Sequence, residues 1–230
     1  MTTITSYELA RMIEHVQKLG RDYSYMEAFC LEAKEHHFVA IAAAQAYVSF
    51  FREILEGSDV HVSAGISFPL SQSSTAAKIF ETRDAIEHGA QEIGFGVNLV
   101  EVKSRHRGFV KNEMEQIVHL CREYGVVSKC TFENCMLEKD EIKWLCEIAS
   151  EVKPDYIKTS TGFAKGGATV EDVRLMRENT DSAVGIKAAA GIKTVEDALA
   201  MIEAGATRIG TSNGIAMMEE LKAREAEGGK

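Results

Sequence analysis

The sequence has few of the features that mark secreted, membrane-spanning or nucleic-acid-binding proteins. Its 230 residues contain no apolar run approaching the ~18 residues of a membrane span. The N-terminal segment MTTITSYELARMIEH lacks the basic start and apolar stretch of a signal peptide. The five cysteines form no CxxC pair and are expected to be free thiols. The net charge of −9 opposes nucleic-acid binding. We therefore expect a cytoplasmic protein with neither a membrane nor a nucleic-acid partner.

Breaks in the chain and cofactor motifs are equally sparse. The two prolines, Pro69 and Pro154, lie outside the segments with helical periodicity. No GxGxxG follows the first predicted strand, which weakens a dinucleotide-binding fold. The pair His36–His37 has no Asp, Glu or Cys at ligand spacing, so we expect no metal or other cofactor. With no linker-like stretch before a short flexible tail at 225–230, the whole chain is predicted to form one domain.

Three lysines occupy equivalent positions in short strand-like runs. Lys129, Lys158 and Lys187 lie in SKCTFE, DYIKTST and VGIKAAA, and each is 29 residues from the next. A strand, a crossover helix and two loops take about 30 residues. Because alternate residues of a strand share a face, three ammonium groups would converge inside a sheet that closes on itself. Crowding and burial both lower the pKa of a lysine, and a neutral lysine attacks carbonyl groups to form a Schiff base.

A repeat of the same length extends over the chain. The similar segments DAIEHGAQEIG and AMIEAGATRIG end at Gly94 and Gly210, which are 116 residues apart, or four such units. Each is typical of a helix closed by a glycine cap, Gly89 or Gly205, and followed by a strand. About eight units fit in the chain, and this regularity favours an α/β fold of the closed (β/α)8 TIM-barrel type over an open doubly wound sheet. The predicted strands are 12–16, 39–44, 61–68, 92–98, 128–133, 156–161, 184–190 and 208–212.

The segment IKTSTGFAKGGATVEDVRLMREN resembles the signature of the deoxyribose-phosphate aldolases, a family of class I aldolases. The similarity continues through GIKAAAGI, EDALAMIEAGATRIGTSNG and SFPL, and weakens before about residue 38. The resemblance implies a (β/α)8 barrel that joins acetaldehyde to glyceraldehyde 3-phosphate. It also implies that Lys158 forms the imine and that Lys187 depresses its pKa. Lys129 matches a third lysine of the pocket, for which a structural pair with Glu133 is the alternative.

Glycine-rich loops after three of the predicted strands form a candidate phosphate site, with simple tight turns as the alternative. Loops after the last two strands commonly hold phosphate in such barrels, and backbone N–H groups at a helix N-terminus suit an anion. The hydroxyl groups of Thr211 and Ser212 would add donors. The expected substrate-binding residues are Lys129, Gly162, Ala190, Gly191, Gly210, Thr211 and Ser212.

The sequence departs from the family pattern at the predicted barrel interior. In the fourth strand Gly94 stands where the family has an aspartate that relays protons, and no nearby carboxylate replaces it. In the first strand Glu14-His15-Val16 replaces the family's Asp-x-Thr, with partial loss of polarity. The expected pocket-lining residues are all small and face inward on strand alternation; they are Ala42, Ala44, Gly94, Gly96 and Ala189.

These departures leave more than one function open. The first is a class I aldolase that adds a small aldehyde or ketone donor to an acceptor such as glyceraldehyde 3-phosphate. A second is an enamine or iminium carboligase with a pocket enlarged for bulkier substrates. A third is an inactive relative that binds sugar phosphates. The expected partner is therefore a small aldehyde, a ketone or a sugar phosphate, and a homodimer is one possible assembly.

Overall fold

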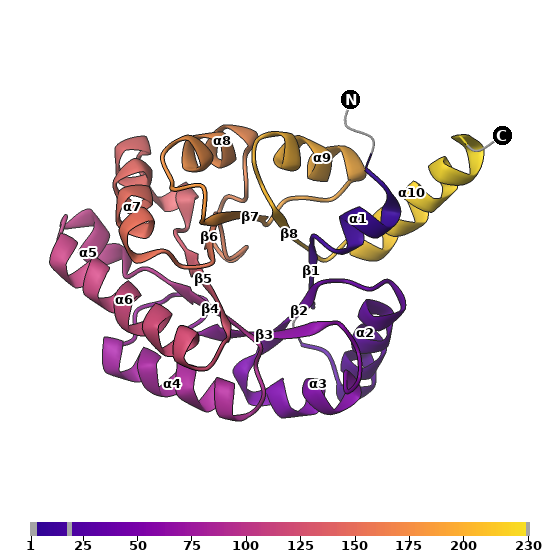
Figure 1. Ribbon diagram of the computed structural model, residues 1–230, viewed down its shortest axis with the longest axis horizontal. Coiled ribbons are helices and arrows are strands. Elements are labelled where there is room, and N and C mark those ends of the chain that lie inside the picture. Colours follow the sequence, from indigo (N-terminus) through magenta and orange to yellow (C-terminus); the bar gives the residue numbers. More distant parts are fainter. Residues whose placement is uncertain (1–3, 18–19, 229–230) are drawn as a thin grey trace.

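The computed structural model describes residues 4–17 and 20–228, and its eight strands form a closed, all-parallel barrel in chain order. Figure 1 looks along the barrel, with the ring of strands at the centre and the helices around it. The strands are β1 (Ile13–Val16), β2 (Ala40–Ala44), β3 (His61–Ile66), β4 (Glu92–Gly96), β5 (Val127–Thr131), β6 (Tyr156–Lys158), β7 (Gly185–Ala189) and β8 (Arg208–Thr211). The predicted TIM-barrel fold is confirmed.

The helices alternate with the strands and bury an apolar layer against the outside of the barrel. Thr169 and Thr194 cap two of them, each accepting a hydrogen bond from a backbone N–H in the first turn. The helices are α1 (Ser6–Ala10), α2 (Tyr23–Glu35), α3 (Val48–Ile54), α4 (Thr75–Glu87), α5 (Leu99–Lys103), α6 (Arg107–Glu123), α7 (Lys139–Val152), α8 (Val170–Glu178), α9 (Val195–Glu203) and α10 (Gly214–Gly228), with short 3₁₀ turns η1 (Gln45–Tyr47) and η2 (Asn134–Met136).

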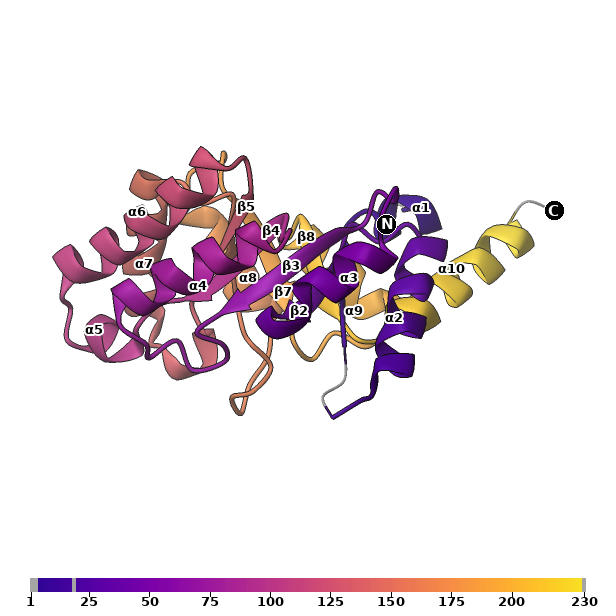
Figure 2. The same ribbon diagram turned by 90° about the horizontal axis from the view of Figure 1, so that it is seen from below.

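All eight predicted strands exist, and the differences lie mainly at their C-terminal ends. The strand predicted at 156–161 ends at Lys158, three residues early, because the chain there turns out of the barrel into the loop before α8. In the side view of Figure 2 this orange loop projects beyond one end of the barrel. The predicted glycine caps are also present, since Gly89 and Gly205 have φ angles of 101° and 113° beyond α4 and α9. None of the helices in the described residues is long and apolar enough to cross a membrane.

The barrel interior combines very small residues with long charged ones. A Cβ at Gly210 would lie 3.1 Å from the Cε of Lys187, and a Cβ at Gly185 would lie 2.6 Å from the ring of Tyr156. The glycines therefore make room for long side chains from the neighbouring strands. Long polar side chains therefore fill part of the barrel interior, where branched aliphatic side chains are usual in this fold.

The two ends of the described chain lie against each other. Glu225 of α10 accepts hydrogen bonds from the backbone N–H and the hydroxyl group of Ser6, at 2.6 and 2.9 Å, and Figure 1 shows α1 beside α10. The predicted flexible tail at 225–230 is therefore wrong for residues 225–228, which continue α10, while 229–230 lie outside the described residues. Glu225 is held in this part of the helix by Ser6, a partner that lies far away in the sequence.

Candidate active site

The C-terminal ends of the strands surround a cavity of about 340 Å³. Lys129, Lys158 and Lys187 reach it from three consecutive strands, β5 to β7. Lys158 and Lys187 are direct neighbours across the β6–β7 pair. Lys129 and Lys187 are almost completely buried, whereas Lys158 is half-buried because its side chain lines the cavity. The structure thus brings together the three lysines that the spacing singled out.

Glu14 lies among these lysines, and sequence reasoning gave it no role. Its Oε1 is 2.5 Å from Nζ of Lys187 and its Oε2 is 2.6 Å from Nζ of Lys129. Strand alternation carries the signal that was missed, because Glu14 pairs in register with Gly210 and shares its inward face. His15, the next residue, points outward and stacks on Phe29 with ring centroids 4.5 Å apart. The first strand has therefore kept an inward carboxylate, while Val16, in the place of the family's threonine, lines the cavity without a hydroxyl group.

Lys129 belongs to a buried ionic network and not to a pair with Glu133. Its Nζ donates to Glu14, to the Ser63 hydroxyl at 2.7 Å and to Glu92 Oε2 at 2.5 Å. Glu133 instead accepts hydrogen bonds from the backbone and the hydroxyl group of Thr161. The predicted structural pair therefore has the wrong partner, because Glu133 lies past the end of β5 and the chain has already left the barrel.

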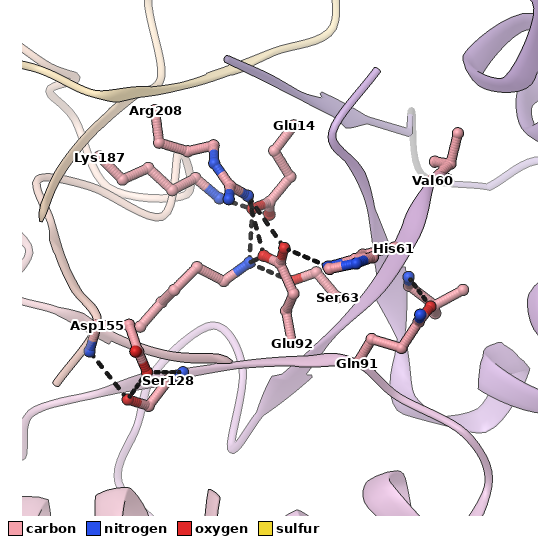
Figure 3. Close-up of polar contacts among 12 residues, drawn as sticks. Glu14, Val60, His61, Ser63, Gln91, Glu92, Ser128, Asp155, Lys187 and Arg208 are labelled. Atoms are coloured by element: carbon pink, nitrogen blue, oxygen red, sulfur yellow. Dashed lines mark hydrogen bonds and ion pairs between the residues drawn. The ribbon is translucent and has the colours of Figure 1, made fainter. Parts of the chain in front are cut away.

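Below Lys129 the network reaches the opposite end of the barrel. Glu92 Oε2 accepts a hydrogen bond from Arg208 Nη1 at 3.0 Å, and Glu92 Oε1 lies 3.0 Å from Nδ1 of His61. Arg208 in turn covers the ring of Tyr156, with its guanidinium carbon 4.9 Å from the ring centroid. Figure 3 shows the side chains of Lys187 and Arg208 pointing toward Glu14, with Glu92 and His61 beyond them.

The two carboxylates of the network are held ionised. Burial opposes ionisation, but Lys129, the His61 hydrogen bond and Arg208 together lower the pKa of Glu92 to about 2. Glu14 behaves in the same way: burial opposes ionisation, while Lys129, Lys187 and Arg208 hold its pKa well below the ordinary value. Glu14 is therefore an acceptor bound to two ammonium groups, which makes it a poor proton donor.

The pKa values of two lysines are lowered as well, which for a lysine favours the neutral form. Burial, with Lys129 as an added like charge, lowers the pKa of Lys158, against the attraction of Glu14. Burial likewise holds the pKa of Lys187 well below its ordinary value, against Glu14 and with the help of Lys158 and Lys129. Burial is the larger cause for both lysines, and a charge excess adds to it, since four basic side chains share this interior with two carboxylates. Releasing a proton from a lysine relieves that excess.

The side of the cavity formed by β2, β3 and β4 is largely apolar and includes the small residues Ala42, Ala44, Gly94 and Gly96, while Ala189 lines the cavity from β7. A Cβ at Gly94 would touch only the carbonyl oxygen of Ala64, at 3.8 Å, so the space above Gly94 is open. A Cβ at Gly96 would lie 2.0 Å from Oγ of Ser71, so that space is already filled. The two glycines are therefore small for different reasons.

Two aromatic rings that sequence reasoning did not single out stand at the mouth. Phe68, in the loop after β3, and Phe163, in the loop after β6, meet edge to face with centroids 5.2 Å apart and planes at 88°. Both are about half exposed. Nζ of Lys158 lies 5.9 Å from the centroid of Phe68. Phe163 sits inside the motif that suggested the family, but nothing in its spacing indicated a partner 95 residues away.

The loops predicted to bind phosphate also line the cavity, and the loop after β6 carries both Gly162 and Phe163. Gly162, Ala190, Gly191, Gly210, Thr211 and Ser212 all line the cavity. Gly162, Ala190 and Gly191 have positive φ angles of 90°, 72° and 82°, so the backbone bends sharply here. The Thr211 hydroxyl donates to the carbonyl of Ile192 at 2.8 Å, so its proton is already used. Lys193 also lines the cavity and adds a cation that the sequence analysis omitted.

A comparison with known proteins shows the family of this chain. A family model described as DeoC/LacD family aldolase matches residues 11–219. The chain belongs to this family. It is 47% identical over 219 residues to the deoxyribose-phosphate aldolase of Lactobacillus acidophilus, which covers 94% of this chain and 92% of that protein. The deoxyribose-phosphate aldolase of Bacteroides thetaiotaomicron is 43% identical and covers 94% of this chain and 91% of its own length.

Solved structures of similar proteins agree with this membership. The aldolase QR15 superposes with a TM-score of 0.89 at 35% identity, covering 94% of this chain and 97% of its own. The tetrameric deoxyribose phosphate aldolase of Aeropyrum pernix superposes with a TM-score of 0.88 at 26% identity, covering 96% and 93%. This DeoC/LacD family member is a class I aldolase, and therefore a lyase.

Proposed function

We propose that this aldolase reversibly adds a small aldehyde or ketone donor to an aldehyde acceptor such as glyceraldehyde 3-phosphate, and so cleaves 2-deoxyribose 5-phosphate in reverse. Lys158 is the residue that forms the imine with the donor. Its neutral amine attacks the donor carbonyl, water leaves, and the protonated imine accepts electrons as the donor loses a proton. The resulting enamine attacks the acceptor carbonyl.

One observation favours Lys158 over the other two lysines. Nζ of Lys187 lies 2.5 Å from a Glu14 oxygen, and Nζ of Lys129 lies within 2.6 Å of two carboxylates. Among the described residues no carboxylate oxygen lies within 4.0 Å of Nζ of Lys158, which faces Phe68 across the cavity instead. The amines of Lys187 and Lys129 are each held by a carboxylate, so Lys158 is the lysine whose amine is left to meet the donor carbonyl. Burial and the neighbouring charge of Lys129 lower its pKa against the attraction of Glu14, and we assign the same effect to Lys187, its neighbour on β7.

The anion of the acceptor is assigned to the loops after β6, β7 and β8. These loops line the cavity, three of their residues have positive φ angles, and the 15-residue helix α10 begins just beyond Asn213, so backbone N–H groups are the proposed donors. Gly162, Ala190, Gly191 and Gly210 supply close backbone approach, and the exposed hydroxyl group of Ser212 and the ammonium group of Lys193 add side-chain contacts. Thr211 shapes the turn, because its hydroxyl group also accepts from the N–H of Asn213 at 2.9 Å.

A second candidate, an enamine or iminium carboligase for bulkier substrates, is favoured by the open space over Gly94. A proton relay at that position is absent, and Glu14 is too strongly held as an anion to donate in its place. Retro-aldol cleavage should therefore be slow relative to imine formation, and the apolar side lined by Ala42, Ala44 and Ala189 accommodates a larger group. The third possibility, an inactive sugar-phosphate-binding relative, is opposed by the low pKa of Lys158.

Borohydride trapping tests the proposal. Incubation with acetaldehyde, then with larger aldehydes and ketones, followed by reduction, should leave a mass increase on the peptide containing Lys158. The matched control is Lys165→Met, on the exposed part of the same loop, which should trap normally. Trapping that persists in Lys158→Met would show that Lys158 is not the nucleophile. Cleavage of 2-deoxyribose 5-phosphate then separates the first candidate from the second.

A homodimer and a cytoplasmic location are proposed on two separate observations. Tyr23 is 60% exposed and meets Tyr47 and Phe50 edge to face, which gives α2 and α3 an apolar surface suited to a homodimer. All five cysteines are free, in keeping with a reducing compartment such as the cytoplasm. Light scattering of the wild type and of Tyr23→Glu tests the dimer, which the charge should weaken.

A further inference from the structure

A continuous series of polar contacts joins Lys187, the strand neighbour of Lys158, to the end of the barrel remote from the cavity. It begins at His61 Nδ1, 3.0 Å from Glu92 Oε1, and continues from Glu92 Oε2 to Nζ of Lys129 at 2.5 Å. Lys129 is 2.6 Å from Glu14, which is 2.5 Å from Lys187. Figure 3 shows this sequence of side chains running from His61 to Lys187.

The middle of this chain is sealed and its outer end is open. The side chains of Glu92, Lys129, Glu14 and Lys187 are at most 3% exposed, whereas the His61 side chain is 39% exposed. His61 is the first residue of β3, at the end of the barrel remote from the cavity. His61 is therefore the member of this series of contacts that meets solvent at that end of the barrel.

Among residues 4–17 and 20–228, Glu92 is the one carboxylate that His61 contacts. From β4 it faces Glu92, and behind Glu92 stand Arg208 of β8 and Tyr156 of β6. On its own strand Ser63 is neutral, and on β2 the residue in register is Ala40. Asp59, two residues earlier, is engaged by Arg11 at 2.9 Å and by His37 at 3.3 Å. A charge that appears on His61 is thus felt first by Glu92.

We infer that His61 is a remote positioning residue of the active site, whose charge sets the basicity of the lysine pair through the His61–Glu92–Lys129–Glu14–Lys187 chain. The inference rests on the proposed role of Lys158. Histidine is the side chain that ordinarily changes charge in the physiological pH range. A buried chain of ion pairs transmits such a change with little screening by solvent.

The direction of the effect follows from the contacts. A cationic His61 competes with Lys129 for Glu92, so Lys129 interacts more strongly with Glu14. Glu14 then stabilises the ammonium forms of Lys187 and Lys158 less, and both amines lose their protons more readily. A positive charge at position 61 therefore makes Lys158 easier to deprotonate, and a neutral side chain at that position makes it harder to deprotonate.

Competitive labelling tests this without requiring catalysis. His61→Lys fixes a positive charge at the outer end, and His61→Gln removes it while keeping a hydrogen-bonding group. The rate of acetic anhydride labelling at Lys158, followed by peptide mass spectrometry from pH 5.5 to 9.5, reports the neutral fraction of this amine. We expect the midpoint to lie about 0.5 unit lower in His61→Lys than in His61→Gln, or about threefold in labelling rate on the acid side.

The wild-type curve should lie between the curves of His61→Lys and His61→Gln. The control is His119→Gln on α6, where His119 contacts Glu123 on the surface at 3.4 Å, and its curve should match the wild type. His61→Arg replaces the lysine variant if the latter fails to fold. Superimposable curves for the cationic and neutral variants would overturn the inference. Absence of borohydride trapping with different curves would instead reject the imine role of Lys158 and retain the coupling.

Discussion

Oε1 of Glu14 lies 2.5 Å from Nζ of Lys187, and Lys187 is the strand neighbour of Lys158. The carboxylate therefore sets which of the two lysines is paired and which faces the cavity. Because Glu14 also contacts Lys129, one anion on β1 serves cations on β5 and β7. Glu14 thus leaves Lys158 without an ion pair, while burial and Lys129 lower the pKa of that lysine against the attraction of Glu14.

Lys187→Leu should raise the pKa of Lys158. The substitution removes a neighbouring cation and frees Glu14, whose charge already favours the ammonium form of Lys158. Borohydride trapping at pH 7 should slow by about 10-fold, which corresponds to about one pKa unit, and recover at higher pH. Lys165→Leu, an exposed lysine outside the cavity, should show the wild-type pH profile. A profile shifted toward lower pH in Lys187→Leu would contradict the assignment.

Gly94→Asp should restore proton relay and raise retro-aldol turnover by at least ~10-fold, since general acid–base assistance is worth roughly 10²–10⁴-fold. Gly94 is not among the residues with positive φ, and a Cβ there meets only a 3.8 Å contact, so the backbone accepts a side chain. The measurement is kcat for cleavage of 2-deoxyribose 5-phosphate. Gly94→Asn has the same bulk without the proton chemistry and should gain little. A folded Gly94→Asp protein with unchanged cleavage would show that the missing aspartate is not what limits the reaction.

Ala44→Leu should penalise bulky substrates selectively. Ala44 lines the apolar side of the 340 Å³ cavity, and a longer side chain there occupies the space available to a large donor or acceptor. We expect kcat/KM for a bulky aldehyde to fall by roughly 10-fold or more, with acetaldehyde affected less than about threefold. Ala76→Leu, on the exposed surface of α4, is the size-matched control. Equal losses for both substrates would argue against an enlarged pocket.

Acid should destabilise the folded barrel in a defined window. The pKa of Glu92 is about 2 in the folded protein against an ordinary 4.5, so the unfolded chain binds a proton that the folded protein refuses. The stabilisation is complete above about pH 4.5 and is lost as the pH falls toward about 2. Glu14 contributes in the same direction. Urea unfolding between pH 6 and pH 3 measures this loss.

The control for the acid experiment is an exposed ion pair. Glu196 contacts Arg224 at the surface, where such pairs contribute little, so Glu196→Gln should keep the wild-type acid dependence. Glu92→Gln should be less stable at pH 6 by about 3 kcal/mol or more, because its cationic partners stay buried, and should lose part of the acid slope. An unchanged slope in a folded Glu92→Gln protein would place the acid response elsewhere.

The fold was accessible from the sequence because it repeats. The 29-residue spacing of Lys129, Lys158 and Lys187 reflects one strand and one crossover helix per unit, and short-range signals such as the Thr169 and Thr194 caps mark where each helix begins. The end of the chain was less accessible. The bond from Ser6 to Glu225 joins residues 219 positions apart, and a tail that reads as polar and exposed gives no hint of it.

The candidate site was accessible only where it follows strand alternation. The lysines and the small residues of the cavity were placed by their phase, but ion-pair partners were not. Glu14 and Glu92 come from strands far apart in the sequence, and phase places several acids and bases on the same inner face without saying which ones touch. The contact between Phe68 and Phe163 depends on two loops whose shapes the sequence does not specify.

The ionic interior also constrains how this chain can change. Removing one member of a buried charge network costs more than replacing several together by well-packed apolar residues. The same cost applies to the five charged residues of this network, Glu14, Glu92, Lys129, Lys187 and Arg208. A relative that has lost one of them should also have altered the residues that contact it. The centre of this barrel should therefore change as a unit, whereas Gly94, whose added Cβ would meet a single contact at 3.8 Å, can change alone.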